Sequence, residues 1–229
     1  MTSNWQEPCQ SGRAAFSIVP LALAHCAQVA SLHLEHLSTG FRGRPGLQLL
    51  QAYYAALVQS DGGSGFVAEQ MGPLGAGHGA VVGYACGLWD PTVVRSTLLR
   101  AALSAQWLRL VLWGGVHVLV RPRLVVELVG RWRTAEKESA PRQAYELRPI
   151  VVDAAMRRNG IGFQLVDTLL ADACRRGFQQ VHVFAEETNV AANAFYRRIG
   201  FRCAERESRQ GAALLRYEYT LPGNESSSS

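Results

Sequence analysis

Two arginines, an asparagine and two glycines lie in the short segment Arg157-Arg158-Asn159-Gly160-Ile161-Gly162, just after the hydrophobic run Ile150-Val151-Val152. Apolar residues then recur at helical spacing as far as about Gly177. The first N–H groups of a helix have no partner within the helix, and the helix dipole adds a partial positive charge there. A strand, a loop of Gly and Arg, and a helix in this order therefore predict an anion site, most often for phosphate.

Three phosphate-binding motifs can be compared with this loop. A Walker loop requires Gly-Lys-Ser or Gly-Lys-Thr, which the segment lacks. A dinucleotide fingerprint requires a third glycine where Leu165 stands, and an acidic residue about 20 positions further on. Neither motif fits, so the pattern that remains is R-x-x-G-x-G, from Arg157 to Gly162.

A second informative segment follows the next predicted strand. Asn189 stands where a side-chain oxygen can cap a short helix, which is predicted to end at Gly200. Within that helix, Tyr196 has a hydroxyl that can donate a proton. The two segments must therefore be considered together.

In combination, the motifs Val152-(x)4-Arg157-x-x-Gly160-x-Gly162 and Asn189-x-x-Ala192-(x)3-Tyr196-(x)3-Gly200-Phe201 resemble those of the GCN5-related N-acetyltransferase (GNAT) family. Each motif alone is weak, but their order, with one strand between them, is specific. The detailed match covers about residues 144–221, and residues 16–90 fit the strand, two helices and hairpin usual in the family. The resemblance implies an α/β (α+β) fold with a mixed, mostly antiparallel central sheet flanked by helices.

The resemblance also implies acetyl-CoA as the acyl donor. In the family, the CoA pyrophosphate lies on the loop, where glycines leave backbone N–H groups accessible. Arginines there can add charge-assisted hydrogen bonds, or they can form a solvated face. The pantetheine arm lies between the strand and the next one, and a strand N–H group stabilises the oxyanion. The cofactor-binding residues expected on this basis are Ile150, Val151, Val152, Arg157, Arg158, Asn159, Gly160, Ile161, Gly162, Asn189 and Tyr196.

Acetyl transfer to an amine needs two proton transfers. An alkyl ammonium, with a pKa of about 10, must lose a proton, and the leaving thiolate must gain one. The resemblance assigns the acid to Tyr196, which could instead pack its ring beside Phe195. It assigns the base to Glu146, which could instead be solvated or paired with Arg148.

The face of the strand on which Glu146 lies depends on whether the strand is regular. In a regular strand, side chains alternate, so Glu146, Arg148, Ile150 and Val152 would share one face. A β-bulge, which this fold commonly has here, would change the parity.

Other candidates are weaker. His33, Glu35 and His36 lie on the first predicted helix, which borders the acceptor pocket in this fold, but we expect unpaired surface side chains. Cys174 lies inside a predicted helix and Cys203 follows another, so neither indicates a nucleophile. Direct attack on the thioester is therefore expected.

Composition sets limits on the function. The chain has 229 residues, 48% of them hydrophobic, which suffices for one core, or for a core and an inserted subdomain. The formal net charge of +5 suits an acidic ligand such as a phosphorylated cofactor, and the spread of the basic residues means that no DNA partner is expected. The five cysteines lack a C-x-x-C pair, which indicates reduced thiols, a cytoplasmic protein and no metal. No secretory signal is evident.

The elements that must position these residues follow from periodicity and turn residues. Strands are expected at 16–19, 66–69, 81–87, 145–152, 180–185, 202–206 and 213–221, and helices at 23–37, 47–58, about 161–177 and about 190–199. We predict a single domain over residues 15–221, a flexible N-terminus at 1–14 and a disordered tail at 222–229.

Residues 91–140 depart from the minimal family pattern as a basic, apolar insertion. Two helices are predicted between Leu98 and Val129, interrupted by Gly114-Gly115 and Pro122. They could pack over the core or in a homodimer, lie on a membrane surface, or form a wall for an anionic or bulky acceptor. The longest uncharged run, 110–120, is shorter than the ~20 residues that a membrane-spanning helix needs.

The function expected is acetyl-CoA-dependent transfer of an acetyl group to a primary amine. The acceptor stays open between a small amine, an amino sugar, an antibiotic and a protein amine. One alternative is a non-catalytic acyl-CoA-binding regulator, which would keep Gly160 and Gly162 without needing Tyr196. The other is a membrane-peripheral interaction protein that acts through the insertion.

Overall fold

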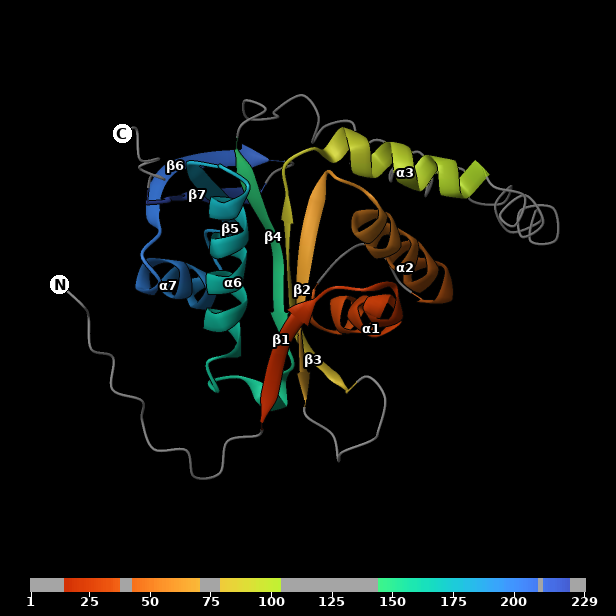
Figure 1. The fold of residues 1–229 in the computed structure, drawn as a ribbon. Coiled ribbons are helices and arrows are strands. Elements are labelled where there is room, and N and C mark those ends of the chain that lie inside the picture. The colour runs from red at the N-terminus through yellow and green to blue at the C-terminus, as the bar shows by residue number, and fades with distance from the viewer. Residues whose placement is uncertain (1–14, 38–42, 71–78, 104–143, 210–211, 223–229) are drawn as a thin grey trace, which may run out of the picture.

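A single seven-stranded sheet forms the centre of the molecule (Figure 1). The computed structural model describes residues 15–37, 43–70, 79–103, 144–209 and 212–222. The strands are β1 (Phe16–Pro20), β2 (Gly63–Gln70), β3 (Val81–Leu88), β4 (Tyr145–Val152), β5 (Gln180–Glu186), β6 (Arg202–Arg209) and β7 (Ala212–Thr220). Their order is β1-β2-β3-β4-β5-β7-β6, and of these neighbouring pairs only β4 and β5 run parallel. The predicted mixed, mostly antiparallel sheet is confirmed.

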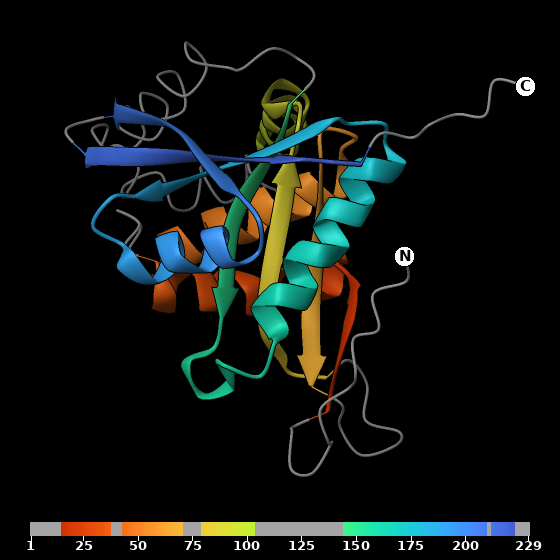
Figure 2. The ribbon, with the colours of Figure 1, turned by 90° about the vertical axis from the view of Figure 1, so that its left-hand side faces the viewer.

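Helices cover both faces of the sheet. On one side lie α1 (Cys26–His36) and α2 (Gly43–Gln59), and on the other lie α6 (Ile161–Arg175) and α7 (Val190–Arg198) (Figures 1 and 2). The helix α3 (Pro91–Leu103) packs against α2. Short 3-10 turns, η1 (Leu23–His25) and η2 (Ala154–Met156), precede α1 and follow β4.

The sheet separates two hydrophobic cores. On the α6 side, Leu165 and Leu169 are fully buried against the strands, one helical turn apart. On the α1 and α2 side, Val29 and Tyr54 are fully buried in the second core. Because strand residues alternate between faces, β2, β3 and β4 each contribute to both layers.

A buried polar network holds the start of β4. The hydroxyl groups of Ser64 and Tyr145 lie 2.8 Å apart, and Ser64 donates to Asp172 at 2.8 Å. Asp172 also accepts from Nε of Arg176 at 2.9 Å. A Cβ at Gly87 would overlap the Tyr145 ring, so glycine is required there. The network fixes the end of β4 at which that strand pairs with β5.

Several boundaries differ from the predicted ones. The second helix begins at Gly43 rather than at 47, because Pro45 is tolerated in a first helical turn. The third begins at Pro91 rather than at Leu98, since Asp90 Oδ1 accepts from the N–H groups of the first turn at 3.0 and 3.2 Å. Aspartate followed by proline was the sequence pattern that would have placed this start.

Three predicted features lie outside the described residues. They are the flexible N-terminus 1–14, residues 104–143, which include most of the insertion, and nearly all of the tail. The roles considered for residues 91–140 therefore stay predictions. Within the ranges that the structure describes, no helix is both long and apolar enough to cross a membrane.

Candidate active site

The strands β4 and β5 separate after a short paired stretch. They pair only at Tyr145 with Val181 and at Glu146 with His182, although both strands are fully described and continue to Val152 and Glu186. Beyond that point, the edge of β4 that faces β5 has no partner strand in the described ranges. Unpaired strand N–H and C=O groups are strong hydrogen-bonding groups, so an extended ligand can pair with them.

A bulge in β4 decides which side chains share a face. Arg148 lies opposite Cys86 and Ile150 opposite Ala85, so Pro149 is the extra residue. Ile150 and Val152 pack against the core under α6, whereas Val151 belongs to the core under α1 and α2. Of the two alternatives considered from the sequence, a regular strand and a bulged one, the structure has the bulged strand.

Glu146 and Arg148 consequently lie on the face that carries α1 and α2. Their neighbours Tyr145 and Leu147 are buried in the opposite core. Nη2 of Arg148 donates to the Glu146 carboxylate at 3.0 Å, which is the pairing considered from the sequence. Burial raises the pKa of Tyr53 on α2 to about 12, and Arg148 opposes this shift. The carboxylate of Glu146 thus lies in a charged, half-buried environment rather than in open solvent.

The loop from Arg157 to Gly162 joins η2 to α6. Its form is held by Nε of Arg157, which donates to the Val152 carbonyl at 3.1 Å, and by the Asn159 amide, which donates to the Met156 carbonyl at 3.2 Å. Arg158 and Gly160 both have left-handed backbones, with φ of 66° and 83°. Such a backbone is easy for glycine and costly for most other residues.

The start of α6 offers free backbone donors. Its first helical hydrogen bond runs from the N–H of Gln164 to the carbonyl of Gly160, at 3.1 Å. The N–H groups of Gly160, Ile161 and Gly162 precede it, so they have no partner within the helix. The side chains of Arg157 and Arg158 are exposed beside them, whereas Ile161 is buried in the core.

Gly162 is not required by the packing of the protein itself. A Cβ at this position would lie 3.6 Å from the Phe195 ring, an ordinary contact distance. A glycine in a helix interior costs stability relative to alanine. Packing among the described residues therefore does not account for the absence of a side chain here.

The helix α7 carries Asn189 at its start and Tyr196 inside it. Asn189 Oδ1 accepts from the N–H of Ala192 at 3.0 Å, so the predicted cap is confirmed. The ring of Tyr196 contacts Phe195, Phe201 and Tyr217, with centroids 5.5 to 5.8 Å apart. Burial raises the pKa of Tyr196 well above its usual range, so its hydroxyl remains protonated at neutral pH.

The prediction that His33 is an unpaired surface side chain is wrong. It is buried beneath α2, where its Nδ1 lies 2.6 Å from the Tyr54 hydroxyl and 2.9 Å from that of Tyr84. Burial lowers the pKa of His33 to about 4. The sequence did contain a signal for this burial, because His33 comes one helical turn after Val29, on the apolar side of the helix. Glu35 is exposed, as expected, whereas His36 is half-buried.

Sequence reasoning missed His182. Only 4% of this residue is exposed, and its Nδ1 has no hydrogen-bond partner within the described part of the chain. It lies beside Glu146 in the last pair before β4 and β5 separate. Burial is the main cause that lowers the pKa of His182, so the ring is uncharged at neutral pH. Only the pairing of β4 with β5 reveals that this histidine and Glu146 are neighbours.

Comparison with known proteins agrees with this geometry. The sequence model of the acetyltransferase (GNAT) family matches residues 33–201. The chain belongs to the GNAT acetyltransferase family. No curated protein sequence matches this GNAT chain.

Solved structures with the same fold include other GNAT proteins. An N-acetyltransferase from Staphylococcus aureus Mu50 has a TM-score of 0.57 at 15% identity, over 91% of this chain and 99% of that one. Arabidopsis thaliana NAA60 in complex with acetyl-CoA has a TM-score of 0.56 at 10% identity, over 90% and 99%. The ribosomal-protein-S18-alanine N-acetyltransferase from Escherichia coli has 0.53 at 14%, over 92% and 98%. At these identities, the similarity shows the fold.

Proposed function

We propose that this GNAT protein transfers an acetyl group from acetyl-CoA to a primary amine by direct attack of the amine on the thioester. Membership of the family supports acetyl transfer in general. The observation that carries the proposal is the separation of β4 from β5 just after Glu146 and His182. The opening lies between the loop at the start of α6, which has N–H groups that the helix does not use, and the Glu146 carboxylate on the opposite face of the sheet.

On the donor side, backbone groups do most of the binding. The N–H groups of Gly160, Ile161 and Gly162 suit a pyrophosphate, and the exposed side chains of Arg157 and Arg158 can add charge-assisted hydrogen bonds. The pantetheine arm, being extended, would lie along the unpaired edge of β4 from Ile150 to Val152. An N–H group there would stabilise the negative charge that develops on the thioester oxygen.

Two side chains are proposed to move protons. Glu146 takes the proton that the ammonium must lose before its nitrogen attacks. A C–N bond then forms while the C–S bond breaks. The departing sulfur takes the proton of the Tyr196 hydroxyl, and the new amide nitrogen releases its second proton to solvent. Tyr196 suits this role because burial raises its pKa and keeps it protonated. Solvent restores its proton after the product leaves.

A screen of amines with acetyl-CoA, followed by mass spectrometry, tests the proposal. We expect acetylated product and free CoA in equal amounts for at least one amine. Measurable CoA affinity without thioester consumption across the panel would instead indicate a non-catalytic regulator. Absence of CoA binding by calorimetry would reject the donor assignment.

A further inference from the structure

Charged side chains gather on the sheet face that carries α1 and α2. We call this set the charged sheet face. It consists of Glu146 and Arg148 from β4, His182 from β5, and Arg216 and Glu218 from β7. Their strand neighbours Tyr145, Val181, Val183 and Tyr217 are buried in the opposite core, so alternation directs these side chains to the α1 and α2 side.

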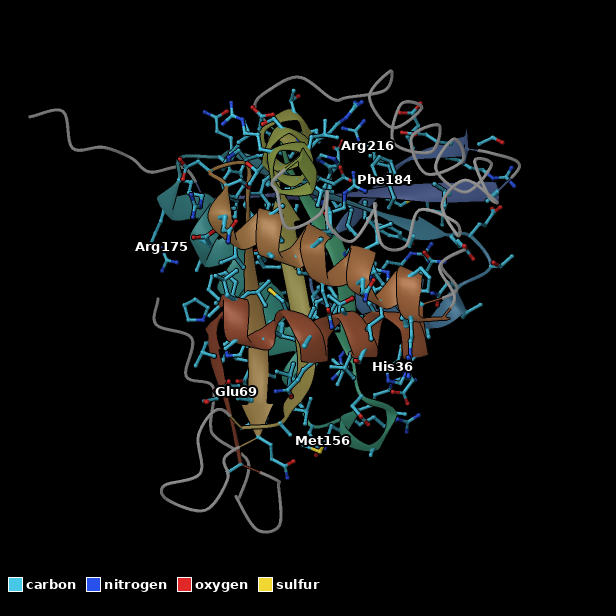
Figure 3. All side chains as sticks on the ribbon, turned by 90° about the vertical axis from the view of Figure 1, so that its right-hand side faces the viewer. His36, Glu69, Met156, Arg175, Phe184 and Arg216 are labelled. Atoms are coloured by element: carbon cyan, nitrogen blue, oxygen red, sulfur yellow. The ribbon has the colours of Figure 1, made fainter. Side chains whose placement is uncertain are left out.

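The members of the charged sheet face are neighbours in the sheet register. Glu146 pairs with His182, and His182 pairs with Glu218, which places an imidazole between two carboxylates. One step further along, Phe184 pairs with Arg216. Figure 3, which views the molecule from the side of α1 and α2, shows Phe184 and Arg216 close together beyond those helices.

Ion pairs use only part of the hydrogen-bonding capacity of this face. Arg148 bonds Glu146, and Nη2 of Arg216 lies 2.6 Å from Glu218. Nε of Arg148, Nε of Arg216 and Nδ1 of His182 are all buried without a hydrogen-bond partner among the residues that the structure describes. A guanidinium has donors and no acceptor, so a buried Nε–H can be satisfied only by an acceptor atom. Buried donors left unpaired lower stability, which makes their accumulation here informative.

The charged sheet face therefore offers both negatively charged carboxylates and positively charged guanidinium groups to a ligand. An ammonium group has donors only, so it suits the carboxylates but cannot satisfy the two arginines. Oxygen atoms that carry negative charge make the strongest hydrogen bonds with guanidinium groups. A ligand that satisfies the whole face must carry an ammonium and an anionic oxygen group together.

The position of the face relates it to the reaction. Arg148 follows Glu146 at the point where β4 leaves β5, and Phe184 lies on the other side of that opening. An amine held beside Glu146 would thus lie next to the path proposed for the thioester. Arg216 is one strand further away, beyond β5.

We propose that the acceptor amine also carries an anionic oxygen group, a carboxylate or a phosphate, and that Arg148 and Arg216 bind this group while Glu146 faces the amine. The proposal rests on the proposed function, because it names the acceptor class of that same site.

Matched acceptors test it in steady-state assays of CoA release. Phenylalanine, phenylalaninamide and phenethylamine share a ring and an amine but present a carboxylate, a neutral amide or no acceptor group. O-phosphoethanolamine and ethanolamine form the phosphate pair. In at least one set, we expect kcat/KM for the acceptor that carries the anionic group to be about tenfold or more higher than kcat/KM for the amine that lacks this group. Equal values within both sets would overturn the proposal.

Variants test which residues cause the preference. In Arg216→Gln, the ratio of kcat/KM for the anionic acceptor to kcat/KM for the acceptor without an anionic group should fall at least fivefold. Arg148→Gln should lower this ratio too. Arg175→Gln is the matched control, because this exposed arginine is the last residue of α6, which covers the other side of the sheet (Figure 1). Its ratio and activity should equal those of the unmodified protein. An unchanged ratio in both Arg216→Gln and Arg148→Gln would reject the assignment.

A binding experiment separates failure of this proposal from failure of the proposed function. Titration with the products N-acetylphenylalanine and N-acetylphenethylamine, in the presence of CoA, requires no turnover. We expect the first to bind at least tenfold more tightly, with the difference reduced in Arg216→Gln. Lack of acetyl transfer together with this preference would count against the catalytic proposal alone. Equal or absent binding of both products would overturn the acceptor class.

Discussion

The proposed donor side and the proposed acceptor side of this molecule are built in different ways. The proposed donor side depends on backbone N–H groups of consecutive residues, from Gly160 to Gly162, whose position follows from the start of one helix. The proposed acceptor side depends on side chains from β4, β5 and β7, which come together only in the folded sheet. The comparison suggests that the donor site is tolerant of side-chain changes, whereas the acceptor site is sensitive to them.

Removal of the proposed base tests the acceptor side most strongly. Glu146→Gln keeps the size of the side chain but cannot take a proton at neutral pH. We expect kcat to fall by about 100-fold or more, with little change in KM for acetyl-CoA. Stopped assays with an accepted amine would measure both constants. Glu187→Gln, at an exposed carboxylate paired with Arg206, is the control; activity in Glu146→Gln equal to that control would leave Glu146 without a role as base.

Removal of the proposed acid tests the point where the two sides meet. Tyr196→Phe retains the ring contacts with Phe201 and Tyr217. We expect a stable protein whose kcat is lower by about 100-fold, because the departing thiolate lacks its proton donor. Tyr219→Phe alters a ring that contacts Phe201 and should keep full activity. Similar turnover in both variants would mean that Tyr196 serves packing alone.

Two glycines with the same backbone separate the donor role from stability. Gly160 and Gly177 have φ of 83° and 81°, and a Cβ at either would meet no atom within 4 Å. Alanine at each should lower the free energy of unfolding by about 1 kcal/mol. Only Gly160→Ala should also weaken CoA binding, by about tenfold in calorimetry, because its methyl group points into the space proposed for the pyrophosphate. Equal CoA affinity in the two variants would contradict the loop assignment.

The pH dependence of stability tests the helices of the proposed acceptor side, with the smallest expected effect on activity. Burial lowers the pKa of His33 from 6.5 to about 4. Between these values the unfolded chain binds more protons than the folded chain, so stability rises with pH and is lost as pH falls from about 6.5 towards 4. In thermal melts, His33→Gln should be less stable at pH 7 but lose less stability on acidification. The same acid dependence in both proteins would show that His33 is not responsible.

Much of the fold was predictable from the sequence. The strand at 145–152, the helix that follows Gly160 and the cap at Asn189 are local features, since periodicity, glycine and a capping amide act over a few residues. Helix starts were predicted less well, because proline in a first turn can be mistaken for an interruption. His33 was misplaced because its burial comes from α2, a separate segment.

The candidate site was predictable in part. The glycine loop and Tyr196 could be proposed as site residues because their motifs lie within short stretches of chain. His182, Arg216 and Glu218 could not, because a charged residue in a strand is typical of a solvated face until its neighbours are known. The bulge at Pro149 also has a tertiary origin, as it is defined by the register between β3 and β4.

The sequence by itself determined the family and the form of the donor loop, because unpaired N–H groups and left-handed glycines are properties of adjacent residues. Tertiary structure alone decided that β4 separates from β5 after Glu146, that the bulge turns Glu146 and Arg148 away from Ile150 and Val152, and that His182 lies between two carboxylates. The physical reason is that strand pairing joins residues far apart in the chain. Their charges and unpaired donors can form one candidate site only when they share one face of the sheet.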